Sequence, residues 1–170
     1  MQFFCLIKNV FTFGQNKIMD FTFDITHKNR ILYKTELEQF SLAELNKIPE
    51  GFNNNIIWNI GHAIATQQLL VHRLSGVPCT VSDEFINTYK KGTKPEREIT
   101  QAEIDEIARL LFSTIDQTKE AYQAGEFKQF NEYTLSTTNG ILKTVKNAIE
   151  FNNYHEGLHL GCILAMKKCL

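Results

Sequence analysis

Apolar residues recur along most of the chain at intervals of three to four positions, the spacing of one buried helical face. The pattern predicts four long helices, over about residues 23–40, 56–74, 100–124 and from 141 almost to the end. Alternating apolar and polar positions, which indicate half-buried strands, occur only in short stretches, so strands are poorly supported. The sequence therefore predicts an all-α fold, and four amphipathic helices of this length most simply close as a four-helix bundle.

Residues at the expected helix ends agree with these boundaries. Ser41 with Glu44, and Thr100 with Glu103, match the capping box that begins a helix. Gly125 is a natural cap after the third helix. The segment between the second and third helices is rich in glycine, proline and threonine and is predicted to be a loop.

Length and charge restrict the class of protein. A chain of 170 residues is the usual size of one domain. Met19 stands just before the first helical pattern, so we expect residues 19–170 to form a single domain and residues 1–18 to be an extension from an upstream start. The net charge of -1 disfavours general nucleic-acid binding, and no apolar stretch is long enough to span a membrane.

The cysteines and the N-terminus suggest where the protein resides. The four cysteines have no Cys-x-x-Cys spacing, and a chain of this size needs no disulfides. The apolar N-terminus lacks the charged start and the cleavage site of a signal peptide. We therefore expect a cytoplasmic protein with reduced thiols. Cys162 falls on the core face of the last helix and is expected to be a small buried hydrophobe.

Two histidines on the last predicted helix indicate metal chemistry. His155 and His159 are four positions apart, so their rings lie one turn apart on one face and can converge on an ion. Firm binding needs a third nitrogen, for which His62 on the second helix is the best candidate. His72 and His27 are weaker candidates and are expected to be ordinary surface histidines.

Three imidazoles without a fourth protein ligand would leave a coordination position for water or substrate, as in catalytic metal sites. Neutral imidazole suits zinc, nickel, iron or copper. The alternative is a plain helical dimer in which the same histidines are core residues and no metal binds.

Residues 155–159 also spell the zinc-protease motif H-E-x-x-H, in which the glutamate is the general base. Such proteases take a third ligand downstream, but residues 160–170 contain no His, Asp or Glu. The protease hypothesis therefore fails. Glu156 could still be a base, but an outer-shell residue that orients a ligand, or a solvated helix residue, is the favoured interpretation.

Two segments carrying these histidines, NNIIWNIGH at 54–62 and FNNYHEGLHLG at 151–161, resemble the DinB/YfiT-like family. The resemblance extends over about residues 21–170. It implies a four-helix bundle with one histidine on the second helix and an H-x-x-x-H pair on the last, which His62, His155 and His159 match one by one. It also implies nickel or zinc as the usual metal, a homodimer, and thiol-dependent isomerase, thiol S-transferase or hydrolase activity.

Two hypotheses follow for the function. The leading one is a metal-dependent enzyme acting on a small substrate, in which the ion lowers the pKa of a bound water or low-molecular-weight thiol. A thiol S-transferase would deliver a thiolate to an electrophile, and a hydrolase would use hydroxide. The second is a non-catalytic metal-binding or stress-response protein, in which the ion only braces two helices.

Overall fold

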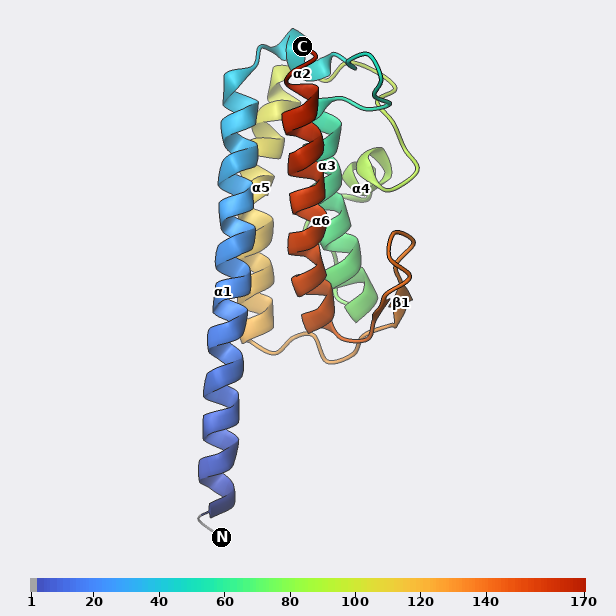
Figure 1. Cartoon of the computed structure of the whole chain (residues 1–170). Helices are drawn as coiled ribbons and strands as arrows, with labels where there is room; N and C mark the ends of the chain where they lie inside the picture. The colour runs from blue at the N-terminus through green and yellow to red at the C-terminus, as the bar shows by residue number, and fades with distance from the viewer. Residues whose placement is uncertain (1–2) are drawn as a thin grey trace.

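Four long helices form a bundle in the computed structural model, which describes residues 3–170 and the side chains of residues 19–170 (Figure 1). They are α1 (Phe3–Gln39), α3 (Ile56–Gln67), α5 (Gln101–Gln123) and α6 (Val145–Met166). Both α1 and α3 pack against α5 and against α6. Helices α1 and α6 run in one direction and α3 and α5 in the other. The predicted all-α four-helix bundle is confirmed.

Helix α1 begins far earlier than predicted. It starts at Phe3 rather than near residue 23, and its first half extends beyond the other helices in Figure 1. The helical backbone is continuous because no proline interrupts it. Residues 1–2 and the side chains of the predicted extension lie outside the described part of the structure, so the domain boundary before Met19 stays a prediction.

The buried face of α1 does not simply follow its apolar residues. Ile31 and Leu32 are among its apolar residues, but 46% and 48% of their surfaces are exposed. Arg30, Tyr33 and Leu37 face the interior instead. An arginine can hold a core position here because a carboxylate from α6 neutralises it, as described below, and hydropathy alone cannot anticipate such a partner.

Both predicted capping boxes are present. Ser41 caps the short helix α2 (Leu42–Asn46) and Thr100 caps α5, each with reciprocal bonds to the glutamate three residues later. At the other end of α5, Gly125 adopts the left-handed conformation, with φ of 66°. The local sequence signals therefore set these helix ends correctly.

Two small elements were missed. The segment predicted as a loop contains the short helix α4 (Asp83–Tyr89). A hairpin of β1 (Tyr133–Thr134) and β2 (Ile141–Leu142) precedes α6, which therefore begins at Val145 rather than near residue 141. The Thr144 side chain caps α6. Strands of two residues are too short to produce an alternating pattern that a sequence could reveal.

A change of helix type displaces His72 from its expected position. After α3 the chain forms a π-helical turn, Gln68–His72, and then a 3₁₀ turn. The wider π turn rotates His72 away from the direction that a continuous α-helix would give it. His72 is instead buried, with its ring nitrogens 2.8 Å from Thr118 Oγ1 and 3.1 Å from the Pro78 carbonyl oxygen. The prediction of a surface histidine is wrong here, whereas His27 is exposed as expected.

Helix α6 departs from its predicted face at two further positions. Cys162 is exposed, and Ile163 takes the core position next to it. Glu156 is completely buried, so the interpretation as a solvated residue is also wrong. In both cases α6 packs between α1 and α3, and contacts on two sides decide which residues are covered.

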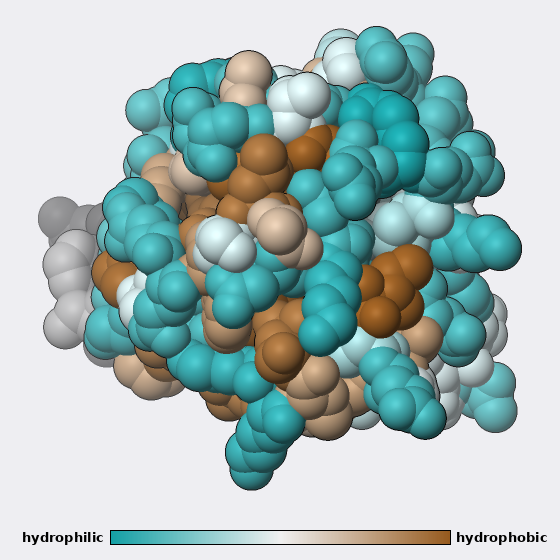
Figure 2. Space-filling model, turned by 90° about the horizontal axis from the view of Figure 1, so that it is seen from above, coloured by the Kyte–Doolittle hydropathy of each residue, from teal (hydrophilic) through white to brown (hydrophobic). Residues whose placement is uncertain are grey.

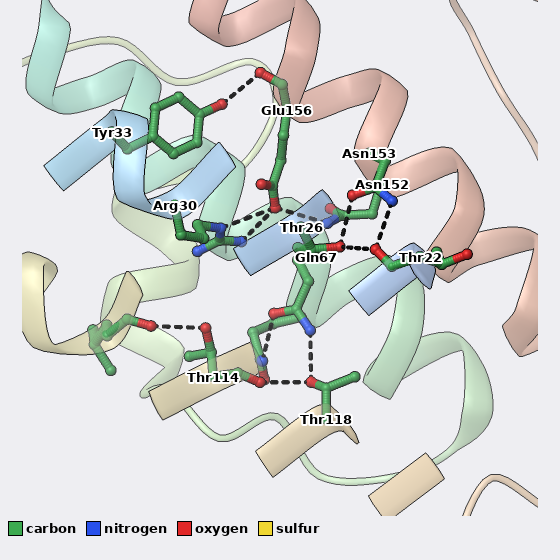
Figure 3. A network of polar contacts seen from close by, with 12 residues as sticks. Thr22, Thr26, Arg30, Tyr33, Gln67, Thr114, Thr118, Asn152, Asn153 and Glu156 are labelled. Atoms are coloured by element: carbon green, nitrogen blue, oxygen red, sulfur yellow. Dashed lines mark hydrogen bonds and ion pairs between the residues drawn. The ribbon is translucent and has the colours of Figure 1, made fainter. Parts of the chain in front are cut away.

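A buried ion pair joins α1 to α6 (Figure 3). Arg30 Nη2 and Nε donate to Glu156 Oε1 at 2.6 and 3.0 Å, and both side chains are fully buried. Asn152 Nδ2 donates to the same oxygen at 2.7 Å. Tyr33 Oη donates to the Glu156 backbone carbonyl at 2.6 Å. These contacts fix α1 against one particular turn of α6, the turn that carries His155.

None of the helices in residues 3–170 is long and apolar enough to cross a membrane.

At the end of the bundle that carries α2, hydrophobic side chains stand among a mostly hydrophilic surface (Figure 2). Leu42 and Ile48, with 39% and 43% of their surfaces exposed, belong to the exposed hydrophobic residues near α2.

Removing one partner of the buried ion pair should be more damaging than removing the pair's charges together. Arg30→Met leaves the Glu156 charge without its cation and should lower the free energy of unfolding by about 3–5 kcal/mol. Combining it with Glu156→Gln should recover much of this loss, because Gln keeps the acceptor for Asn152. Urea unfolding measures both. Arg109→Met, which removes an exposed pair with Glu106, is the control and should change stability by less than about 1 kcal/mol. Equal losses in the single and double variants would contradict this account.

Candidate metal centre

Three histidines from two helices meet inside the bundle. His62 comes from α3, and His155 and His159 come from successive turns of α6. Each offers a ring nitrogen, and these nitrogens lie within 4.8 Å of one another. The ring centroids are 4.5 to 5.2 Å apart. Among the residues whose side chains are described, this is the group of His, Cys, Asp and Glu that could hold a metal ion.

Backbone and ring contacts orient His62. Its Nδ1 lies 2.7 Å from the Tyr89 carbonyl oxygen, and because a carbonyl only accepts, Nδ1 must carry the proton. The lone pair is then on Nε2, which is 3.3 Å from Thr66 Oγ1. The ring also stacks on Trp58, with centroids 4.7 Å apart and planes 9° from parallel. His62 is thus held with Nε2 facing away from the Tyr89 carbonyl and available to bind an ion.

An amide from α3 orients His159. Its Nδ1 is 2.8 Å from Asn59 Oδ1. The Asn59 amide is fixed in turn, because its Nδ2 donates to the Asn55 carbonyl at 2.8 Å. Nδ1 therefore donates, and Nε2 has the lone pair that could bind an ion. A hydrogen bond of this kind to the second ring nitrogen is usual for metal-binding histidines.

His155 differs because no hydrogen bond holds its ring among the described residues. Its Nδ1 is buried and has no partner there. A buried polar atom without a partner is costly, and a metal ion would supply one. Two of the three histidines donate a hydrogen bond from Nδ1, and the buried Nδ1 of the third has no partner among the described residues. This set of imidazole nitrogens fits a divalent metal ion.

Burial keeps all three rings neutral at pH 7. It is the main cause that lowers the pKa of His155 to about 3 and the pKa of His159 to about 4, and it also lowers the pKa of His62. His159, His62 and Arg30 lower the pKa of His155 further, and His62 lowers the pKa of His159 further. Because metal ions bind neutral imidazole, the site needs no proton release at neutral pH before it can bind one.

The groups that hold the histidine rings come from residues that the sequence did not single out. Asn59 accepts from His159 and the Tyr89 backbone carbonyl accepts from His62. Glu156, which was considered for this role, is hydrogen-bonded instead to Arg30 of α1 and to Asn152. Glu156 thus supports the turn of α6 next to the site rather than a ligand ring. The sequence could have indicated Asn59, because it lies three positions before His62 on a helix and therefore one turn away on nearly the same face.

A cavity of about 430 Å³ opens beside the histidines, and we call it the triad pocket. Its wall is mainly apolar. Besides the three histidines, it is lined by Thr66, Leu69, Leu70, Arg73, Leu74, Lys91, Tyr133, Leu135, Ser136, Thr137, Phe151 and Leu158. A larger hollow of about 790 Å³ lies at α4 and the loop after it, but none of the three histidines lines it. A small molecule in the triad pocket would therefore lie next to the proposed metal.

Comparison with known proteins identifies the same fold. The family model for the DinB superfamily matches residues 26–163. A crystal structure described as "the conserved protein of locus from Enterococcus faecalis" superimposes with a TM-score of 0.59 at 14% identity. The superposition covers 89% of this chain and 96% of that chain. No curated protein matches the chain significantly.

Gly61 should be needed beside His62 because the Tyr89 ring lies against it. A Cβ at this position would lie 2.5 Å from Tyr89 Cδ1. We expect Gly61→Ala to lower the free energy of unfolding by about 1–3 kcal/mol, and to weaken metal binding by displacing the carbonyl that holds His62. Gly161→Ala on α6, where a Cβ meets nothing within 4 Å, should instead stabilise by up to about 1 kcal/mol. Denaturant unfolding of both variants checks this, and a neutral Gly61→Ala would contradict it.

The metal-free protein should lose stability as the pH falls from about 6.5 to 5. In this range the unfolded histidines bind protons, whereas folded His155 and His159, with pKa values of about 3 and 4, do not. Stability is therefore complete above pH 7 and falls by up to about 1.4 kcal/mol per pH unit for each such histidine. Thermal unfolding against pH measures the slope, to which buried His72 also contributes. His155→Leu should make the slope smaller, and an unchanged slope would show that His155 is protonated in the folded protein.

Proposed function

This chain belongs to the DinB superfamily, and we propose that it is an enzyme that uses one divalent metal ion, bound by His62, His155 and His159, to act on a small substrate. The observation that carries the proposal is the convergence of three neutral imidazoles beside a pocket of small-molecule size. Family membership and the histidine cluster together fit a metal-binding protein. The activity is the further step that we propose.

The ligand set supports zinc or nickel as the metal. All three donors are imidazole nitrogens, which suit borderline metals better than magnesium or calcium. Bound there, such an ion supplies a positive charge that lowers the pKa of a water or a thiol toward neutrality. The chain's own part is to hold two of the rings through Asn59 and Tyr89 and to keep the site largely apolar.

The pocket wall favours transfer of a low-molecular-weight thiol over hydrolysis. Attack by water usually employs a general base, and no Asp or Glu is among the described residues that line the triad pocket. The nearest carboxylate in sequence, Glu156, is fully buried against Arg30. A thiolate is already a strong nucleophile and needs no such base. We therefore rank a thiol S-transferase first and a hydrolase second.

The alternative is a non-catalytic role, which the positions of the three histidines on two different helices also support. His62 comes from α3 and the other two from α6, so an ion would cross-link two helices of the bundle. An ion of this kind would stabilise the fold whether or not it takes part in a reaction. Loss of the metal would then lower the melting temperature by several degrees while no thiol or ester is consumed.

We also propose that the chain forms a homodimer through exposed apolar side chains. Ile31 and Leu32 on α1, and Leu164 on α6, have 45% to 48% of their surfaces exposed. Since α1 and α6 are packed neighbours, a second copy could cover both helices together.

Elemental analysis of protein purified without an affinity tag tests the metal site. We expect about one zinc or nickel ion per chain, and almost none in a His155→Ala, His159→Ala double variant. The matched control is His27→Ala, which changes an exposed histidine and should leave the metal content unchanged. No ion in the unmodified protein would overturn the proposal. Thiol-transfer and hydrolysis assays with and without the ion then separate the enzyme from the structural alternative.

A further inference from the structure

The wall of the triad pocket combines two kinds of group. Most of it is apolar, and leucine side chains and Phe151 make up much of this apolar surface. It also includes Ser136 and Thr137 of the hairpin, with their hydroxyl groups, and the cations Lys91 and Arg73. A mainly apolar pocket with a few polar groups orients a ligand as well as binding it.

The two cations are not equivalent. Arg73 Nη2 lies 3.0 Å from Asp83 Oδ1, so a carboxylate already balances its charge. Lys91 Nζ donates to Ser136 Oγ, a neutral group, and has no carboxylate partner among the residues whose side chains are described. No Asp or Glu is among the described residues that line the pocket, and the lowered pKa values of the three histidines keep them neutral at pH 7. Lys91 is therefore the one unbalanced charge in the described pocket wall.

The contact between Lys91 and Ser136 also places this charge at the pocket. Lys91 lies just after α4, two residues beyond Tyr89, whose carbonyl holds His62. Ser136 lies in the hairpin between β1 and β2, and its neighbours Leu135 and Thr137 line the pocket as well. The hydrogen bond thus joins two segments that line the pocket. The Lys91 ammonium group can replace this hydrogen bond to a hydroxyl with one to a bound anion.

We propose that the triad pocket binds small amphipathic carboxylates, with the carboxylate on Lys91 and the apolar body against the leucine wall. This rests on the proposed function only in placing the substrate beside the histidines. Lys91 is the one side-chain cation of the described pocket wall without a carboxylate partner, and its single charge matches that of a carboxylate. A charge-assisted hydrogen bond from Lys91 supplies the preference for the anion, and the apolar wall supplies most of the affinity.

Binding of 4-phenylbutyrate and of its neutral amide, 4-phenylbutanamide, tests the proposal by calorimetric titration of the purified protein. The two probes share the apolar body and differ in the charge. We expect the carboxylate to bind about tenfold more tightly, and the preference to decrease as salt is added. Lys91→Ala should remove the preference while leaving the affinity for the amide unchanged, and Lys91→Arg should retain it. Lys90→Ala, which removes the neighbouring exposed lysine that does not line the pocket, should have no effect.

Other outcomes overturn the proposal. Equal binding of the two probes would show that the pocket does not select an anion. A preference that survives Lys91→Ala but disappears in the His155→Ala, His159→Ala variant would place the carboxylate at the histidines instead. The metal content of the same samples is measured separately, so loss of the metal site and loss of the Lys91 contact are distinguished.

Discussion

Helix α6 must bury polar side chains on two sides at once, and the rest of the structure follows from how this is achieved. Toward α1 it presents Glu156, whose charge would be very unfavourable in the interior without Arg30. Toward α3 it presents His155 and His159, which meet His62. The two requirements fix both the rotation of α6 about its axis and its position along that axis between α1 and α3.

The ion pair and the histidine cluster are adjacent in the chain, and this links the fold to the site. Glu156 directly follows His155, so the contacts that hold Glu156 also set the position of that ring. His155 itself has no hydrogen bond among the described residues. Its position therefore depends on the backbone of α6, while His62 and His159 are held by groups of their own. A metal ion bound here would therefore have two ligands that are held by hydrogen bonds and one whose position depends on helix packing.

The segments outside the long helices shape the surroundings of the histidines. Helix α4 brings the Tyr89 carbonyl to His62, and the loop after it brings Lys91 to the hairpin. The hairpin forms one wall of the triad pocket. The bundle thus supplies the three histidines, and short connecting elements supply the carbonyl that holds His62 and several groups that a ligand in the pocket would meet.

The sequence by itself determined the helical bundle, the capped helix ends and the two turns that carry the histidine pair, because spacing along a helix is a local property. It also indicated His62, through its position on the second helix. Only the tertiary structure decided that Arg30 and Glu156 are buried, that His72 lies in the core and Cys162 outside it, and that Asn59 and Tyr89 orient the rings. Each of these depends on a partner distant in sequence, and a hydropathy pattern contains no information about which polar groups will meet.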